Sequence, residues 1–213
     1  QNKFKYLNSH DSLTFTKSRQ LFGLRQFYQA KKIARVWLVE GQFDVMRLSE
    51  IGEVGIACSG TAFSDAQGRQ IAKLNTTVIL TFDRDIAGFS AAKKAAFDLL
   101  LRGVDLRVFV PPDGTEGKDI DEIFRDNPTA KYETPYYIDR LISLCVGEGA
   151  ELTALVRSAA QAIACVQDPL IKEQYTLALA NKTKYAAEAI RAIPAPVEIE
   201  IEARPLEINS RKK

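Results

Sequence analysis

The sequence predicts an α/β protein in which a small, mostly parallel sheet is flanked by helices and is followed by a helical bundle. Two observations carry this prediction. Between residue 36 and about residue 124, short apolar runs alternate with segments of helical periodicity. Beyond Pro135, only the helical periodicity continues. The chain has 213 residues, 46% of them hydrophobic, which is enough to bury one good core and a second small one.

Four apolar runs predict four strands, at residues 36–39, 55–58, 78–82 and 106–110. Because these runs are continuously apolar, both faces of the sheet are expected to be covered, as in parallel sheets. Helices are expected at residues 26–32, 43–51, 64–74 and 91–100. Ser64 is the expected N-cap of the third of these helices, and Gly103 the expected C-cap of the fourth.

The segment after Pro135 predicts four further helices, at about residues 138–145, 152–163, 169–179 and 182–193. Asp168-Pro169 opens the third, because Pro is favoured in the first turn of a helix. Its candidate core residues are Leu170, Tyr175, Leu177 and Leu179. The chain therefore divides into residues 1–35, an α/β domain at 36–130, a helical subdomain at 131–193, and a linker or tail at 194–213.

Net charge, cysteine spacing and the lack of long apolar runs bear on the possible partners and location of the protein. The net charge of +2 argues neither for nor against a polyanionic partner. Cys58, Cys145 and Cys165 are widely spaced, and His10 offers no second ligand, so no zinc site is expected. We expect reduced, buried thiols, in the cytoplasm or inside an organelle. No signal peptide or membrane span is apparent, and the start at Gln1 suggests a fragment of a longer protein.

Acidic residues follow three of the four predicted strands. Glu40 follows the first, Asp83 and Asp85 follow the third, and Asp119 and Asp121 follow the fourth. Because the carboxyl ends of parallel strands meet at one edge of a sheet, these carboxylates are expected to converge there. Carboxylates in close proximity repel one another unless a cation or water screens them, and Mg²⁺ prefers oxygen ligands.

Residues 80–88 on their own leave two interpretations open. In one, Asp83 and Asp85 project from the end of the strand toward a divalent ion. In the other, they belong to a solvated loop in which Asp85 caps the next helix. The acidic residues on the neighbouring strands favour the metal site.

Several segments together resemble a known family. They are Lys5-Tyr6-Leu7-Asn8-Ser9, Lys17-Ser18-Arg19-Gln20-Leu21-Phe22-Gly23-Leu24, Glu40-Gly41-Gln42-Phe43-Asp44-Val45, Gly60-Thr61, Phe82-Asp83-Arg84-Asp85-Ile86-Ala87-Gly88 and Lys118-Asp119-Ile120-Asp121-Glu122. In this order they resemble the TOPRIM fold, and they are most similar to bacterial replicative primases of the DnaG type. The resemblance covers about residues 5 to 193. It makes residues 1–35 the end of the N-terminal part of a polymerase core and residues 36–130 a TOPRIM domain.

The resemblance implies a nucleotidyltransferase that makes short RNA primers from ribonucleoside triphosphates on a single-stranded DNA template. Its metal ligands, for Mg²⁺ or Mn²⁺, would be Asp83, Asp85, Asp119 and Asp121. Glu40 would ligate metal or act as a general acid or base, and Asp44, one helical turn later, would ligate metal or orient a neighbour.

The resemblance also implies partners. Lys5, Tyr6, Asn8 and Lys17 match positions that contact the incoming nucleotide. A replicative helicase is the expected protein partner, through a region absent from this chain. The family's zinc-binding module and most of the N-terminal polymerase core are also absent, so we expect this piece to bind metal yet to make primers poorly by itself.

Four residues depart from the family's usual pattern. They are Ser18, Gln42, Arg84 and Ile120, which stand where Gly, Tyr, Gly and Pro are usual. Arg84 lies between two expected metal ligands and would contact a phosphate or point to solvent, and we favour solvent. A TOPRIM nuclease and a catalytically silent binding module remain alternatives, although the segment Lys5 to Ser9 favours a primase.

Overall fold

Four parallel strands form one sheet in the order β2-β1-β3-β4. This computed structural model describes residues 12, 16–30, 33–59, 63–111 and 114–196. The strands are β1 (Arg35–Val39), β2 (Gly55–Ala57), β3 (Thr77–Leu80) and β4 (Leu106–Val108). Each lies within two residues of its predicted bounds, so the predicted α/β class with a parallel sheet is confirmed.

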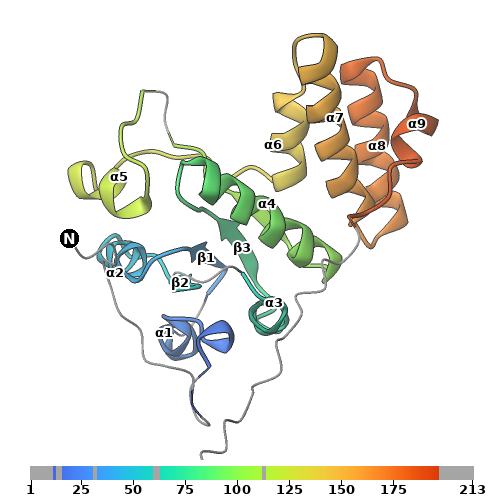
Figure 1. The fold of residues 1–213 in the computed structure, drawn as a ribbon. Coiled ribbons are helices and arrows are strands. Elements are labelled where there is room, and N and C mark those ends of the chain that lie inside the picture. The colour runs from blue at the N-terminus through green and yellow to red at the C-terminus, as the bar shows by residue number, and fades with distance from the viewer. Residues whose placement is uncertain (1–11, 13–15, 31–32, 60–62, 112–113, 197–213) are drawn as a thin grey trace, which may run out of the picture.

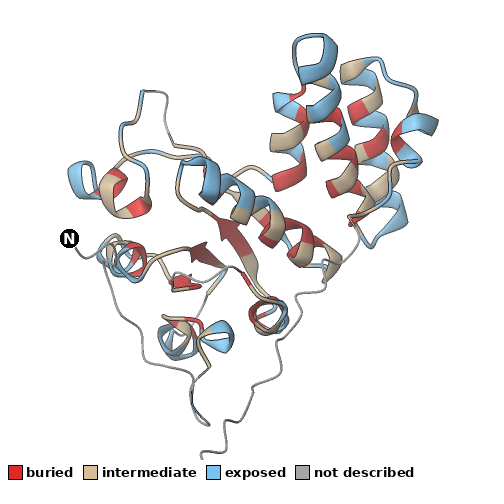
Figure 2. Ribbon diagram, in the orientation of Figure 1, coloured by how far each residue is buried: buried red, intermediate tan, exposed pale blue. Residues whose placement is uncertain are grey.

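Both faces of the sheet are buried, as the continuous apolar runs predicted. Side chains alternate along β1, where Val36 and Leu38 belong to one core cluster and Trp37 and Val39 belong to another. Figure 2 shows the buried residues concentrated in the strands and on the inner sides of the helices. The sheet is therefore the middle layer of three.

Helices on both sides make the outer layers (Figure 1). The cluster that contains Trp37 also takes side chains from α2 (Gln42–Glu50) and α5 (Ile120–Asp126). The cluster that contains Leu38 takes side chains from α3 (Asp65–Ala72) and α4 (Ile86–Leu101). A short 3₁₀ helix η1 (Lys17–Arg19) and helix α1 (Leu24–Gln29) precede the sheet. The helix predicted at 26–32 thus begins and ends earlier, because Ala30 is already extended.

Helix starts follow the capping residues in the sequence. Ser64 accepts a hydrogen bond from the Gln67 N–H and caps α3 as predicted. Asp168 accepts hydrogen bonds from the first turn of α8 (Pro169–Thr183), which has Pro at its first position. Gly103 follows the end of α4 with a positive φ of 73°, which glycine adopts without strain.

The C-terminal helices α6 (Tyr137–Leu144), α7 (Gly149–Ala164), α8 and α9 (Ala187–Arg191) form the predicted bundle, which packs against α4 through α7. Two details of the prediction are wrong. Residues 182–193 do not form one helix, because α8 runs on to Thr183 and Lys184 then adopts a left-handed conformation. Leu170 and Leu177 are exposed and not core residues, whereas Leu179 is fully buried and Tyr175 packs partly against the core.

Helix geometry explains the error at α8. Leu170 and Leu179 are nine residues apart, which is about two and a half turns, so they lie on opposite sides of the helix. The cysteines Cys58, Cys145 and Cys165 are buried free thiols, as expected. Among the described residues, no helix is long and apolar enough to cross a membrane.

Candidate metal-binding and nucleotide-binding site

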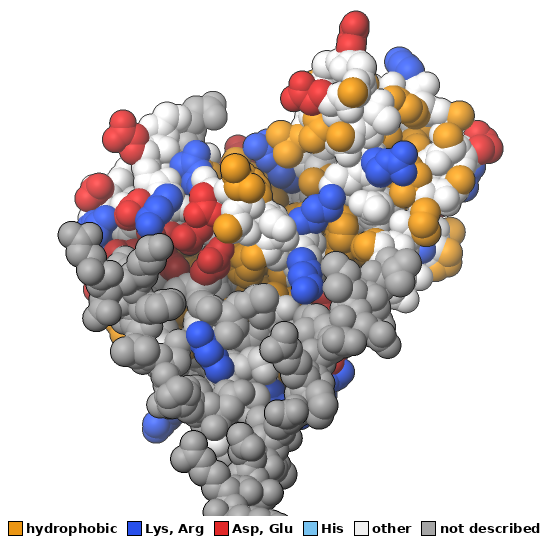
Figure 3. All heavy atoms as spheres, in the orientation of Figure 1, with side chains coloured by type: hydrophobic (Ala, Val, Ile, Leu, Met, Phe, Trp, Pro, Cys, Tyr) orange, Lys and Arg blue, Asp and Glu red, His pale blue; other side chains and the backbone are white. Residues whose placement is uncertain are grey.

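Acidic residues gather where β1 and β3 end. Glu40 follows β1 directly and Asp83 lies three residues beyond β3. Glu40 Oε1 accepts a hydrogen bond of 3.1 Å from the backbone N–H of Asp83, which ties the two strand ends together. On the face shown in Figure 3, acidic side chains gather between the parts of the molecule that α5 and the start of α4 occupy in Figure 1.

Asp85 and Asp119 both cap helices that start at this rim. Asp85 Oδ1 accepts from the Gly88 N–H at 2.7 Å at the start of α4. Asp119 Oδ1 accepts from the Glu122 N–H at 2.8 Å at the start of α5. The capping interpretation of Asp85 is therefore correct as geometry. A carboxylate has two oxygens, so a capping aspartate still has the second to offer a cation.

Burial and the charges of neighbouring carboxylates raise the pKa of Asp83 and of Glu40. The pKa of Asp83 is raised by burial and by the charges of Asp119 and Asp85, while Lys118 opposes the shift. The pKa of Glu40 is raised by burial and by Asp83 and Asp85, although the hydrogen bond from the Asp83 N–H opposes this. Glu40, Asp83, Asp85 and Asp119 thus lie within electrostatic reach of one another.

Asp44 lies beneath this rim and is buried. It does not stand one helical turn after Glu40, because α2 begins only at Gln42 and Glu40 precedes the helix. Its two oxygens accept hydrogen bonds of 3.1 Å from the backbone N–H groups of Gly41 and Asp121. Burial and the charges of Asp119 and Asp83 nevertheless raise the pKa of Asp44 to about 6. These contacts favour the orienting role over the ligand role.

Asp121 lies apart from the other carboxylates. Arg47 of α2 donates to its Oδ1 at 3.0 Å, and Arg125 lies 3.5 Å from its Oδ2. Two cations therefore hold the side chain of Asp121 between α2 and α5. The structure does not bring it to the group formed by Glu40, Asp83, Asp85 and Asp119.

The carboxylates fit a divalent cation as a donor set. Among the described residues, no three carboxylate, His or Cys side chains are close enough to form a ready chelate. Mg²⁺ seldom uses such a cage, because it keeps several waters and binds through one or two carboxylates together with substrate phosphates. The carboxylates of Asp83 and the acidic residues near it offer oxygen ligands, and a bound cation would reduce the repulsion among them. They match that mode of binding.

Three features of the site escaped the reading of the sequence. Gly88 packs so closely on the backbone of Asp83 that an added Cβ would lie 2.1 Å from the Asp83 carbonyl oxygen. Glu122 accepts a 2.9 Å hydrogen bond from the Lys118 N–H, and its charge raises the pKa of Asp83. Glu122 stands three residues after Asp119, the N-cap of α5. This spacing could have placed Glu122 in the first turn of that helix from the sequence alone.

Arg84 is the third feature. It is exposed, as expected, but its side chain also makes contacts that the sequence did not indicate. Its Nη1 donates to the carbonyl oxygens of Thr115 and Gly117, at 3.0 and 3.1 Å. Its backbone N–H donates to the carbonyl of Lys118 at 2.8 Å. Arg84 thus binds the loop that precedes Asp119.

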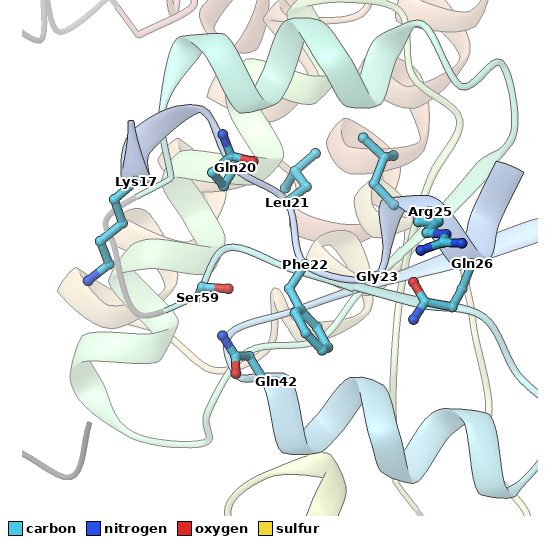
Figure 4. A pocket seen from close by; sticks show the side chains of 10 residues that line it. Lys17, Gln20, Leu21, Phe22, Gly23, Arg25, Gln26, Gln42 and Ser59 are labelled. Atoms are coloured by element: carbon cyan, nitrogen blue, oxygen red, sulfur yellow. The ribbon is translucent and has the colours of Figure 1, made fainter. Parts of the chain in front are cut away.

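A cavity of about 370 Å³ lies between α1 and the start of α2. Figure 4 shows Lys17 at one end and Arg25 at the other, with Phe22, Gln42 and Ser59 between them. Gln42 begins α2 only two residues after Glu40, so the cavity adjoins the acidic rim. Of the residues expected to contact a nucleotide, Lys17 lines this cavity, and Lys5, Tyr6 and Asn8 lie outside the described residues.

Aromatic residues of the strands belong to the core, as expected. Trp37 is fully buried and contacts Phe109, with ring centroids 5.5 Å apart. Phe82 packs partly buried against the other cluster. The turn at Gly60-Thr61 lies outside the described residues.

Comparison with known proteins gives a consistent picture. Residues 37–124 match a family model described as Toprim-like. A DNA primase from Aquifex aeolicus is 38% identical over 57% of this chain and 24% of its own length. A DNA primase from Pasteurella multocida is 34% identical over 67% of this chain, again 24% of its own length. The chain therefore spans about a quarter of the length of these relatives.

Solved structures extend the likeness over most of the chain. The zinc-binding and RNA polymerase domains of the Aquifex aeolicus primase superpose with a TM-score of 0.71 at 27% identity, over 90% of this chain and 48% of that one. A DnaG primase catalytic domain bound to single-stranded DNA superposes with a TM-score of 0.65 at 25% identity, over 88% and 63% of the two chains. The likeness therefore reaches beyond residues 37–124 into the C-terminal helices.

Proposed function

We propose that this chain, which is similar in sequence and fold to the TOPRIM region of primase catalytic cores, supplies the metal-binding part of a primer-synthesising site. The reaction would join ribonucleoside triphosphates into a short RNA on a single-stranded DNA template. The chain spans about a quarter of the length of the relatives that it matches, and the activity of those whole proteins enters here only as part of the proposal.

One observation carries the proposal: Glu40, Asp83, Asp85 and Asp119 meet at one edge of a parallel sheet and repel one another. Ligands of such sheets bind outside the carboxyl ends of the strands. Glu40, Asp83 and Asp119 are partly buried and Asp85 is exposed. Like charges in such a cluster raise the electrostatic energy of the folded protein, and divalent cations would lower it.

Asp83, Asp85 and Asp119 are the proposed ligands of Mg²⁺ or Mn²⁺. When bound, such an ion would stabilise the negative charge that builds on the transferred phosphoryl group and on the departing pyrophosphate. The capping bonds of Asp85 and Asp119 hold their carboxylates in place before any ion arrives, which avoids a cost of reorganisation. Asp44 would hold the start of α5, and with it Asp119, through its bond to the Asp121 N–H.

Glu40 has two roles open to it. Its raised pKa and its place beside Asp83 suit either a proton acceptor for the attacking 3′-hydroxyl or a further metal ligand. A Glu40→Gln variant separates them: loss of a proton acceptor changes the pH dependence of the rate, whereas loss of a ligand raises the metal concentration needed for half-maximal rate.

Lys17 is the proposed contact for the nucleotide triphosphate. Lys17 stands at one end of the cavity that Gln42 also lines, and it would supply a point charge to the phosphates there. Single-stranded DNA is the proposed template, a proposal supported by the structure of a related catalytic domain bound to single-stranded DNA.

The test is primer synthesis from labelled ribonucleotides on single-stranded DNA by the full-length parent protein, with wild type and Asp85→Asn. Asn is as good an N-cap as Asp, so this change removes the charge but keeps the cap of α4. Asp126→Asn, at the exposed end of α5, is the matched control. We expect Asp85→Asn to lose most primer synthesis and Asp126→Asn to keep it. Equal synthesis by Asp85→Asn and wild type would refute the assignment of the site.

Two further measurements address the other functional classes. Cleavage of single-stranded DNA with Mn²⁺ and no nucleotides, lost in Asp85→Asn, would favour a nuclease. Calorimetric titration of Mn²⁺ into wild type and Asp83→Ala addresses the silent module. Equal, negligible heats in both proteins would favour that module over an enzyme.

A further inference from the structure

Arg84 joins two loops of the acidic site through its side chain. Its guanidinium Nη1 donates to two carbonyl groups of the loop formed by residues 114–118, those of Thr115 and Gly117. The distances are 3.0 and 3.1 Å, both within the range of good hydrogen bonds. Arg84 itself lies between Asp83 and Asp85, so its side chain reaches from the loop after β3 to the loop before α5.

Charged residues at the end of the 114–118 loop and just after it act electrostatically on Asp83. Lys118 ends the loop and Asp119 follows it, and the two act on the pKa of Asp83 in opposite directions. Glu122 accepts from the Lys118 N–H and also faces Asp83 electrostatically. The position of this loop therefore sets how Asp119 stands relative to Asp83.

The contact depends on the side chain at residue 84. The backbone N–H of Arg84 donates to the Lys118 carbonyl, and any residue except Pro would keep that bond. The bonds to Thr115 and Gly117 need a long side chain with a donor at its end, as Arg84 has. On its other side the loop packs closely on α5, because Gly117 has φ +108° and an added Cβ would meet Ile123 Cγ1 at 3.1 Å.

We propose that Arg84 is a positioning residue that clasps the 114–118 loop and so holds Asp119 opposite Asp83 for divalent cation binding. The inference rests on the proposed metal site. It gives Arg84 a role that does not involve touching a phosphate or the metal.

A positioning role and a purely electrostatic role for Arg84 predict opposite changes in metal affinity when its side chain is removed. A cation beside the carboxylates repels Mg²⁺, so its removal would strengthen metal binding if charge were its only effect. If Arg84 positions the 114–118 loop, its removal leaves that loop free to move. Metal binding must then order the loop, so the affinity for the metal falls. The sign of the change in affinity separates the two roles.

The first experiment measures amide hydrogen exchange of residues 114–119 without any metal, in wild type and in Arg84→Ala. Two lost hydrogen bonds should speed exchange in this segment by about three- to tenfold, with α4 unchanged. Arg157→Ala, an exposed arginine of α7, removes the same charge far from the site and is the control. Unchanged exchange in Arg84→Ala would overturn the clasp, whether or not the site binds metal.

The second experiment titrates Mn²⁺ into wild type, Arg84→Ala, Arg84→Lys and Arg84→Met, with Asp83→Ala as the variant that tests the metal site itself. We expect Arg84→Ala and Arg84→Met to bind about three- to tenfold more weakly. Arg84→Lys, which keeps the charge on a shorter and more flexible stem, should fall between them and wild type.

Tighter binding in Arg84→Ala, or faster exchange with unchanged affinity, would overturn the positioning role. A wild type that binds no Mn²⁺, or that binds as Asp83→Ala does, contradicts the proposed metal site instead. The exchange experiment still decides whether the clasp exists, so the two failures are distinguishable.

Discussion

Gly88, in the first turn of α4, lies against the backbone of Asp83, so that a Cβ at residue 88 would stand 2.1 Å from the Asp83 carbonyl oxygen and 3.0 Å from its nitrogen. Real Cβ atoms do not approach backbone so closely. The same glycine donates its N–H to the Asp85 carboxylate. Gly88 therefore fixes the distance between the two aspartates and the helix that follows them.

Gly88→Ala should displace the loop that carries Asp83. Overpacking of this kind costs about 1–3 kcal/mol, and the higher helix propensity of Ala returns up to about 1 kcal/mol. We expect a net loss of unfolding free energy and weaker Mn²⁺ binding, measured by urea denaturation and calorimetry. Ser90→Ala, an exposed change in the same helix, is the control. A Gly88→Ala protein as stable as wild type, with unchanged affinity, contradicts this packing argument.

The raised pKa of Asp44 predicts that the free energy of unfolding falls as the pH rises. Its folded pKa of about 6 lies above the ordinary value of 3.8, so between these values the folded state binds the extra proton. The free energy of unfolding contributed by Asp44 therefore decreases from pH 4 to pH 7, by up to about 3 kcal/mol. Urea denaturation of wild type and Asp44→Asn at several pH values measures it as the difference between the two proteins. The free energy of unfolding of wild type minus that of Asp44→Asn should fall as the pH rises. A value of this quantity that stays constant or increases with pH would refute the prediction.

Asp119 and Asp121 should behave differently although they are two residues apart. Asp119→Asn keeps the cap of α5 but loses the charge, and we expect metal affinity to fall at least about tenfold with little loss of stability. Asp121→Asn breaks the pair with Arg47, which costs at most about 1 kcal/mol, and should leave the affinity unchanged. Calorimetry on both variants checks this. Equal losses of affinity would place Asp121 among the ligands.

Glu53 shows the opposite pH dependence to Asp44. Burial alone would raise its pKa, but hydrogen bonds from Arg35, Trp37 and Tyr132 hold the pKa below its ordinary value. Glu53→Gln should cost about 1–3 kcal/mol at pH 7. Because the folded pKa is lowered, the advantage of wild type is present above pH 4.5 and is lost as the pH falls below it.

Chemical denaturation at pH 7 and pH 3.5 measures this advantage, with the exposed Glu151→Gln as the control. An advantage of wild type that persists undiminished at pH 3.5 would contradict it.

Local patterns were sufficient for the four strands and for most of the helices, but not for α5 or for the break between α8 and α9. The apolar run at Val78-Ile79-Leu80 predicts a buried strand, and the structure places β3 there with neighbours on both sides. Ser64 and Asp168 mark helix starts because a cap is a contact within one turn of chain. Spacing alone failed at Leu170, because the packing of α6, α7 and α9 around α8 decides which of its residues are buried.

The candidate site divides in the same way. That Glu40, Asp83, Asp85 and Asp119 share one rim follows from the order of strands and acidic residues, because parallel strands end on the same edge. The side chain of Asp121 follows no such rule. Its direction depends on Arg47, which is 74 residues away in the sequence.

By itself the sequence determined the class of fold, the helix caps and the set of acidic residues at the end of the sheet, because these depend on neighbours along the chain and on the regular geometry of strands. Only the tertiary structure decided that Gly88 must stay small, that Asp44 is held by backbone amides, and that Arg84 binds the 114–118 loop. Each of these is a contact between separate segments brought together by packing, and no local pattern specifies which partner a side chain will meet.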